Sequence, residues 1–291
     1  MRKYLQQNGL IGDDVAVFHA RTRDRADLPV YRCRSSGVMF LDVEPDAPEG
    51  RYVDKEIDND GLTSKTQLGE AKISTVMLED SIRRLEQFRT SIVDRDLCDF
   101  GAGHGLFLKY ARPLARSVAG IELNRKQIAD LEQEGIRVET SISVFPTESF
   151  DVVTLFHVLE HLHRPIEILS SIRERMRPKG RLIVEVPHAR DFLHQSLESE
   201  AFKAFTFWSE HLVLYTRESL RGVIEKAGFR DVHVKGYQRY GLENHLHWLT
   251  RQKPGGHQHW AHLADADLNR AYGALLQSLD QTDTLIATAT A

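Results

Sequence analysis

Residues 97–105 read LCDFGAGHG, a short apolar stretch that runs into three glycines at alternate positions. Glycine allows the backbone to turn tightly and to approach a ligand closely. A helix is predicted directly afterwards, over Leu106–Arg112, and the free N–H groups of a helix N-terminus favour a carboxylate or a phosphate. This stretch therefore predicts a strand, a ligand-binding turn and a helix in succession.

The spacing of this turn narrows the class of ligand. Its glycines are followed by Leu106 and Phe107, so the last glycine of the dinucleotide motif GxGxxG is absent, and no Gly-Lys-Ser/Thr sequence marks a phosphate-binding loop. Glu122 ends the next predicted strand, where a carboxylate can accept hydrogen bonds from ribose hydroxyls. The pattern favours a ribose-containing cofactor other than a nicotinamide dinucleotide.

Outward from the turn, predicted strands and helices alternate. This order predicts an α/β fold with a Rossmann-like, doubly wound sheet of seven strands, the last of them antiparallel. A helical insert at about 238–281 precedes the last strand. The predicted strands are Leu97–Phe100, Ser117–Leu123, Arg137–Ile142, Phe150–Phe156, Arg181–Val186, Asp231–Tyr237 and Asp283–Thr290. The predicted helices include Thr75–Phe88, Leu106–Arg112, Arg125–Glu134, Pro165–Met176 and one that Thr216 caps, with Ser219 at its third position.

The first part of the chain has a different pattern. Strands are predicted at Val15–Ala20 and Val30–Asp42, and an exposed loop at Glu44–Gly61, where proline, glycine and acidic residues accumulate. We therefore divide the chain into a small β-rich N-terminal region, 1–74, and a cofactor-binding domain, 75–291.

Composition excludes several classes of protein. The formal net charge of the 291 residues is -4, which disfavours a nucleic-acid binder. Two cysteines, Cys33 and Cys98, do not suggest a disulfide framework, and the first residues lack the apolar core of a signal peptide. No stretch approaches 18 consecutive apolar residues. A cytoplasmic protein is expected, without a transmembrane segment, and a homo-oligomer is compatible with the sequence.

Three segments together resemble one enzyme family. CDFGAGHGLFLKYARPLARSVAGIELN at 98–124 and FDVVTLFHVLEHLHRPIEILSSIRERMRPKGRLIVEVPH at 150–188 are similar to class I S-adenosylmethionine-dependent methyltransferases. EHLVLYTRESLRGVIEKAGF at 210–229 extends the similarity to a branch of sugar methyltransferases that carry an N-terminal flanking region. The resemblance implies S-adenosyl-L-methionine as cofactor and an α/β methyltransferase fold.

The resemblance assigns cofactor contacts along the strand ends. Gly101 and Gly103 would face the methionine end, Glu122 the ribose, and 141–143 the adenine, while Phe156 and His157 would line the side of methyl transfer. The full set of implied cofactor residues is Asp99, Gly101, Ala102, Gly103, Glu122, Leu123, Ser141, Ile142, Phe156 and His157.

The branch also implies a catalytic pair. Its sugar-modifying members carry a Glu-His pair, proposed as base and partner, which Glu210 and His211 match. His211 is thus the first candidate for the general base and His157 the second, although His211 could equally hold its loop by hydrogen bonds. Glu160 and His161, in the LEHL turn, are interpreted mainly as structural.

The acceptor is less closely defined. Aromatic and polar residues after the sixth strand suggest a carbohydrate site at Tyr237, Asn244 and His245, with a packed amphipathic helix as the alternative. We expect methylation of a hydroxyl, or less favourably a carbon, of a sugar, a sugar-linked metabolite or a glycan, in polysaccharide biosynthesis. The alternatives are a quinone, lipid or natural-product acceptor, and a scaffold that binds the cofactor without catalysis.

No metal is expected from the sequence. The His-x-His pairs at 161/163, 245/247 and 257/259 lack the other residues of a zinc motif. Residues 33–37, CRSSG, look like a degenerate form of the Cys-x-x-Cys-Gly knuckle of the branch, and no upstream cysteine pair exists to complete a structural zinc site.

Overall fold

The computed structural model describes residues 1–44 and 75–291, so the predicted loop lies outside the described residues from position 45 on. The chain divides into two compact units. Within the described residues, one unit comprises 1–44, 156–168 and 184–289, and the other comprises 75–155, 169–183 and 290–291.

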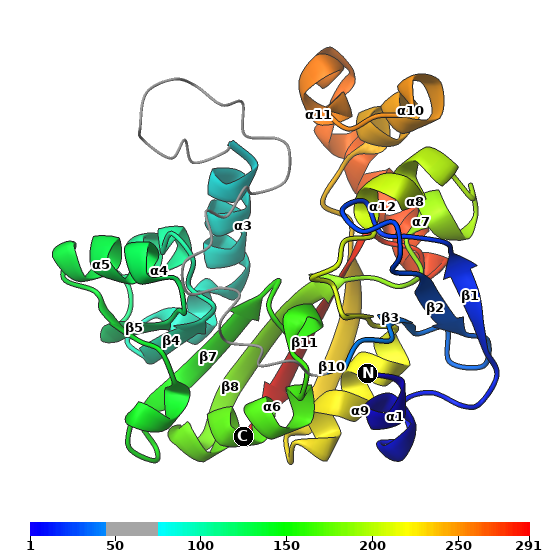
Figure 1. Ribbon diagram of the computed structural model, residues 1–291. Helices are drawn as coiled ribbons and strands as arrows, with labels where there is room; N and C mark the ends of the chain where they lie inside the picture. The colour runs from blue at the N-terminus through cyan, green and yellow to red at the C-terminus, as the bar shows by residue number, and fades with distance from the viewer. Residues whose placement is uncertain (45–74) are drawn as a thin grey trace. The chain divides into compact units, whose positions relative to one another are not determined.

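Seven strands form the large sheet in the order β10-β11-β8-β7-β4-β5-β6, and β11 runs against β8 (Figure 1). This confirms the predicted fold class, including the antiparallel last strand. The strands that differ most from the prediction are β8, which begins earlier, and β5 and β6, which end earlier; β4, β10 and β11 each differ by one residue at their start. The strands are β4 Asp96–Phe100, β5 Ser117–Ile121, β6 Arg137–Glu139, β7 Phe150–Phe156, β8 Met176–Pro187, β10 Arg230–Tyr237 and β11 Thr284–Thr290.

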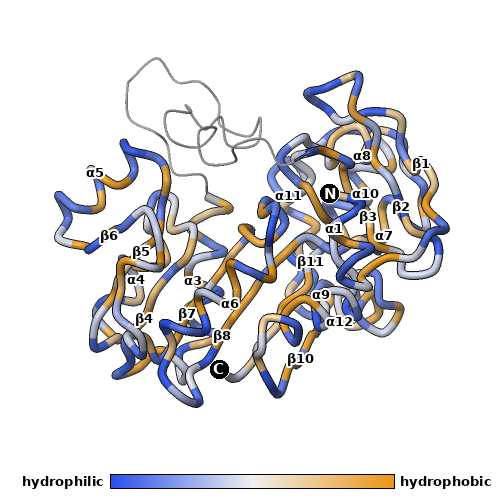
Figure 2. The backbone as a smooth tube through the Cα atoms, turned by 60° about the horizontal axis from the view of Figure 1, so that its bottom comes forward, coloured by the Kyte–Doolittle hydropathy of each residue, from blue (hydrophilic) through white to orange (hydrophobic). Residues whose placement is uncertain are grey.

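The central strands are buried because their residues are almost uniformly apolar, as expected for parallel strands covered on both faces. Figure 2 shows this hydrophobic character along β7 and β8. Val153 and Leu155 of β7, and Ile183 and Val184 of β8, have no exposed surface. Strand β4 pairs in parallel with both β5 and β7.

Helices connect the strands and form the insert. The N-cap predicted at Thr216 for α9 is confirmed, and the structure shows a full capping box: Ser219 N donates to Thr216 Oγ1 at 3.3 Å, and Thr216 N donates to Ser219 Oγ at 2.9 Å. The helices are α1 Arg2–Gln7, α3 Thr75–Ile92, α4 Leu106–Ala111, α5 Arg125–Gln133, α6 Pro165–Arg175, α7 Phe192–Gln195, α8 Glu200–Thr206, α9 Arg217–Lys226, α10 Leu242–Arg251, α11 Gly256–His259 and α12 Ala266–Ser278, with 3-10 turns η1 Ile142–Val144, η2 Leu159–His161 and η3 Ala261–Leu263.

The N-terminal region contributes a second, antiparallel sheet in the order β1-β2-β3-β9. Its strands are β1 Val15–His19, β2 Val30–Cys33, β3 Met39–Leu41 and β9 Val213–Leu214. The predicted single strand Val30–Asp42 is wrong. The chain turns back after Cys33, whose carbonyl accepts a hydrogen bond from Gly37 N at 2.9 Å, and Gly37 has a left-handed φ of 75°. Within the described residues, no helix is both long and apolar enough to cross a membrane.

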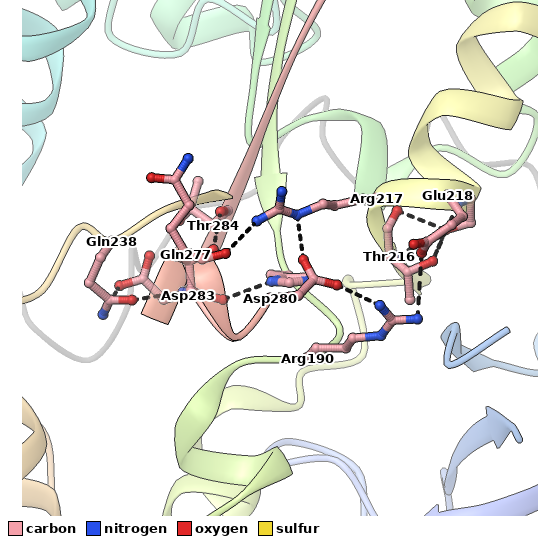
Figure 3. Close-up of polar contacts among 12 residues, drawn as sticks. Arg190, Thr216, Arg217, Glu218, Gln238, Gln277, Asp280, Asp283 and Thr284 are labelled. Atoms are coloured by element: carbon pink, nitrogen blue, oxygen red, sulfur yellow. Dashed lines mark hydrogen bonds and ion pairs between the residues drawn. The ribbon is translucent and has the colours of Figure 1, made fainter. Parts of the chain in front are cut away.

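A charge network secures the turn between α12 and β11 (Figure 3). The carboxylate of Asp280 forms ion pairs with Arg217, at the start of α9, and with Arg190, which follows β8. Arg190 also lies 3.5 Å from Glu218. One partly buried carboxylate therefore joins three segments that are distant in the sequence.

We expect Asp280→Asn to lower the free energy of unfolding by about 1–2 kcal/mol, because it weakens two partly shielded ion pairs together. The control is Asp267→Asn, which removes an exposed pair with Arg270 and should cost less than about 0.5 kcal/mol. Urea unfolding of both variants measures the difference. Equal losses would contradict a special role for Asp280.

Candidate functional site

The glycine turn after β4 has the conformation that its sequence requires. Gly101, Gly103 and Gly105 all have left-handed φ angles, of 82°, 55° and 68°. A Cβ atom on Gly105 would lie 2.1 Å from Leu131 Cδ2, so Gly105 is required for packing. A Cβ atom on Gly103 would meet nothing within 4 Å among the described residues. The backbone at Gly103 is therefore open to a ligand.

Glu122, directly after β5, fastens this turn. Its carboxylate accepts hydrogen bonds from the backbone N–H groups of Gly103 at 2.7 Å, Leu123 at 2.8 Å and Asn124 at 2.9 Å. Hydrogen bonds to an ionised acceptor are stronger than neutral ones. Glu122 therefore holds the turn in shape before any ligand arrives, and its predicted contact with a ribose would be an additional function.

Asp99 lies within β4 and is buried. Its Oδ1 accepts a hydrogen bond of 2.6 Å from Thr154 Oγ1 of β7. Burial raises the pKa of Asp99 to about 7, against the opposing effect of the Thr154 hydroxyl. Ala102 is also buried, and its Cβ would lie only 3.0 Å from a Cβ on Gly120. Both residues thus pack the base of the turn.

Three neighbouring parallel strands end at the same edge of the sheet. In the pairing of β4 with β5, Phe100 is opposite Ile121, and in that of β5 with β6, Ile121 is opposite Glu139. The glycine turn, Glu122 and Ser141 follow these strand ends in turn. Ser141 caps η1, whose first residue, Ile142, is buried. The structure therefore brings the predicted methionine, ribose and adenine contacts to one edge, where ligands of such sheets bind.

His157, which directly follows β7, lies between two carboxylates. Its Nδ1 is 3.3 Å from Glu160 Oε1, and its Nε2 is 3.3 Å from Glu185 Oε1. Burial alone would lower the pKa of His157, but the contacts with Glu160 and Glu185 outweigh it, so the pKa is raised. His157 also has a left-handed φ of 57°, which is rare outside glycine and is frequent at functional sites.

The predicted base lies in a second group around Glu160. Ligand atoms of Glu160, His161 and His211 lie within 4.8 Å of one another. Burial, together with the neighbouring His161, lowers the pKa of His211 to about 3, so the ring is neutral. Glu210 is buried, and its backbone carbonyl accepts a hydrogen bond from His161 Nδ1 at 2.9 Å. The LEHL turn, interpreted from sequence as mainly structural, thus joins the predicted Glu-His pair.

Sequence reasoning missed Glu185 and Arg239. Glu185 interrupts the apolar run LIVEV of β8 and is completely buried, and a carboxylate within such a run is a signal of a paired charge. Arg239 Nη1 lies 3.3 Å from His157 Nε2. Nothing in its local sequence indicates this contact, because it depends on how the loop after β10 folds.

Asp283 shapes that loop (Figure 3). Its carboxylate accepts hydrogen bonds from Arg239 N at 3.0 Å, Tyr240 N at 3.1 Å and Gln238 Nε2 at 2.8 Å, while Asp283 N donates to Gln238 Oε1. The pKa of Asp283 is raised by burial, although Arg239 opposes the shift. Asp283 is thus a positioning residue for Arg239.

The predicted acceptor residues occupy different environments. Tyr237, the last residue of β10, is half-buried. Asn244 and His245 lie on the buried side of α10. The ring of His245 stacks on Phe192, and its Nδ1 lies 2.7 Å from the hydroxyl of Tyr272 on α12. The structure gives His245 a role in packing the insert, which was the alternative interpretation of this segment.

We expect Gly103→Ala to weaken binding of S-adenosylmethionine at least tenfold, because the methyl would occupy the open side of the turn. The substitution also adds strain of about 1 kcal/mol in the left-handed conformation. Gly9→Ala is the matched control, since Gly9 has a φ of 62° and equally open surroundings outside the turn. Calorimetric titration should show unchanged affinity for Gly9→Ala. Unchanged affinity for Gly103→Ala would exclude the turn as the cofactor site.

Buried neutral histidines should make the fold sensitive to acid. Burial lowers the pKa of His194 to about 3 and that of His245 to about 4. In the unfolded chain these histidines have a pKa near 6.5. Their contribution to the free energy of unfolding is therefore fully present above pH 6.5 and is lost as the pH drops towards 4. We expect His194→Phe to reduce the slope of unfolding free energy against pH by up to about 1.4 kcal/mol per pH unit. Urea unfolding of both chains at pH 7, 6 and 5 measures this slope. An unchanged slope in His194→Phe would show that His194 does not cause the sensitivity to acid.

Part of the chain is similar to known O-methyltransferases. The chain is 31% identical over 108 residues to the mitochondrial ubiquinone biosynthesis O-methyltransferase of Schizosaccharomyces pombe, covering 33% of this chain and 39% of that protein. It is 29% identical over 130 residues to the ubiquinone biosynthesis O-methyltransferase of Neisseria meningitidis, covering 38% of this chain and 54% of that protein. The chain therefore spans about half or less of the length of these relatives.

A solved structure shows the same fold. The SAM-dependent methyltransferase of Archaeoglobus fulgidus aligns with a TM-score of 0.52 at 20% identity, over 74% of this chain and 94% of that one. Residues 74–234, more than half of the 291, match the family model described as "Methyltransferase domain". These matches confirm the predicted S-adenosylmethionine-dependent methyltransferase domain. The chain belongs to the methyltransferase-domain family.

Proposed function

We propose that the chain transfers the methyl group of S-adenosylmethionine to a hydroxyl group of a small acceptor. The hydroxyl oxygen attacks the methyl carbon in line with the C–S bond, which breaks with its electron pair going to sulfur, so that S-adenosylhomocysteine leaves. The hydroxyl proton must be removed in the same reaction. The observation that carries the proposal is the group of Glu160, His161 and His211, which can receive that proton.

His211 is the residue that we propose to take the proton. Its Nδ1 atom is buried and has no hydrogen-bond partner among the described residues. A carboxylate beside an imidazole stabilises the imidazolium that forms, and Glu160 is placed for this role. Glu210 holds His161 through its carbonyl, and His157 contacts Glu160, so we assign both as positioning residues.

A hydroxyl of a sugar or a sugar-linked metabolite is the acceptor that we favour, because Glu210 and His211 match the Glu-His pair of sugar methyltransferases. Tyr237 is the predicted acceptor contact that stays partly exposed. A hydroxyl of a quinone precursor is the second candidate, because the two curated relatives described above are named for ubiquinone biosynthesis.

The test is a screen with isotopically labelled S-adenosylmethionine, read by mass spectrometry. One arm contains nucleotide sugars and short glycans, and the other contains dihydroxyphenols with and without isoprenoid chains. Mass gain at a sugar hydroxyl supports the first acceptor class, and gain at a phenol supports the second. Labelling of nitrogen or carbon alone would overturn the proposal of O-methylation, and absence of cofactor binding would overturn it entirely.

With an acceptor in hand, we expect His211→Ala to lower kcat at least about 100-fold, the usual contribution of a general base. Binding of S-adenosylmethionine should stay within twofold, because His211 is not a predicted cofactor contact. His262→Ala removes an exposed histidine of η3 and serves as the control. Full turnover by His211→Ala would remove His211 from the mechanism.

A further inference from the structure

We infer that Glu160, His161 and His211 form a binding site for a divalent transition-metal ion, with Zn²⁺ as the first ion to test. The three side chains offer one carboxylate oxygen and two imidazole nitrogens, all within 4.8 Å of one another. This donor set occurs in His₂Glu zinc sites and in the two-histidine, one-carboxylate sites of iron enzymes. Mg²⁺ and Ca²⁺ prefer oxygen ligands alone and match it less well.

The ring of His161 is oriented as a metal ligand would be. Its Nδ1 lies 2.9 Å from the carbonyl of Glu210, and a carbonyl can only accept, so Nδ1 carries the proton. In the neutral ring Nε2 then has a lone pair, and it lies 3.9 Å from Glu160 Oε1. Metal-binding histidines commonly donate their other N–H to a backbone carbonyl in this way.

The other two side chains have buried atoms without a hydrogen-bond partner among the described residues, although Glu160 forms an ion pair with His157. Both carboxylate oxygens of Glu160 and the Nδ1 atom of His211 have no hydrogen-bond partner among the described residues. Glu160 has no exposed surface, and its contact at 3.3 Å is an ion pair with His157. Buried polar atoms normally have partners, and a bound cation would supply one for the Glu160 carboxylate and for His211 Nδ1.

The backbone holds the two contributing segments together. Leu212 N donates to the carbonyl of Glu160 at 2.8 Å, beside the hydrogen bond from His161 to Glu210. The ring of Trp208 packs against His211, with centroids 5.6 Å apart. Ligand atoms of a tetrahedral zinc site lie about 3.3 Å apart, so small side-chain rotations would close the group around an ion.

Three protein ligands leave one position of a tetrahedral ion open, as in catalytic zinc sites. This part of the inference rests on the proposed O-methyl transfer. The acceptor hydroxyl would bind the ion through its oxygen, release its proton to water and attack the methyl carbon as the more nucleophilic oxyanion. In the chain without the ion, His211 receives this proton; with the ion bound, His211 is a ligand and the ion activates the hydroxyl instead.

A metal site here differs from the expectation of no metal, which rested on histidine pairs close in the sequence. The proposed site combines two adjacent residues of η2 with a histidine 50 positions later, just before β9. Only one histidine of the pair 161/163 takes part.

The test uses the tag-free 291-residue chain, which is stripped of metal with a chelator and then titrated with Zn²⁺ without cofactor or acceptor. We expect elemental mass spectrometry to find one Zn²⁺ per chain. We also expect the Zn²⁺-loaded chain to have a higher melting temperature than the metal-stripped chain. Glu160→Gln and His211→Gln should each weaken binding at least about tenfold. Glu185→Gln is the matched control, since Glu185 is equally buried and also lies 3.3 Å from His157, but is outside the group. It should bind Zn²⁺ like the wild type.

Co²⁺ provides a measurement that needs no variant. Bound to two nitrogens and an oxygen in four-coordinate geometry, it should give visible d–d absorption in the wild-type chain that Zn²⁺ abolishes. Absence of stoichiometric Zn²⁺ and Co²⁺ uptake by the wild type would overturn the inference, as would equal loss of binding in Glu160→Gln and Glu185→Gln. Neither result depends on the acceptor, so failure here and failure of the O-methylation screen are distinguishable.

Discussion

An ionised carboxylate in an apolar interior persists only where cations, donors or a metal compensate for lost hydration. Glu160 and Glu185 are both completely buried in this protein, and His157 lies 3.3 Å from each. This constraint organises the unit that contains them. His157, with its left-handed backbone, lies between the two carboxylates, and His161 and His211 lie beside Glu160.

The carboxylate of Glu122, beside the glycine turn Gly101–Gly105, meets the same physical requirement in a different way. Glu122 is satisfied by three backbone N–H groups, one of them from the turn itself. Because the carboxylate is already paired, the turn is organised in advance, and a ligand that binds there need not supply the ordering energy. Asp283 uses the same arrangement, with two backbone N–H groups and one side-chain amide, to fix the loop that carries Arg239.

These buried charges explain why the two proposals focus on one place. Methyl transfer to a hydroxyl requires a group that takes up the hydroxyl proton or lowers the pKa of the hydroxyl. Ligand atoms of Glu160, His161 and His211 lie within 4.8 Å of one another and can meet either need. A general base and a metal ion are two ways to meet the same requirement. The base acts by receiving the proton, whereas the ion acts by making the hydroxyl more acidic.

The fold class and the glycine turn could be predicted from the amino-acid sequence, because both depend on local signals. Alternating apolar strands and helices dictate a parallel sheet, and glycines at alternate positions before a helix dictate the turn with Glu122 beside it. The sequence did not determine the hairpin that divides Val30–Asp42, since an apolar run does not reveal where it folds back.

Only the tertiary structure shows which buried charged and polar residues lie together. Glu160, Glu185 and His211 come from η2, β8 and the segment before β9, and no spacing in the sequence reports that these segments converge. It also decided that His245 packs against Phe192 and Tyr272, because the side of a short amphipathic helix that is buried depends on what covers it.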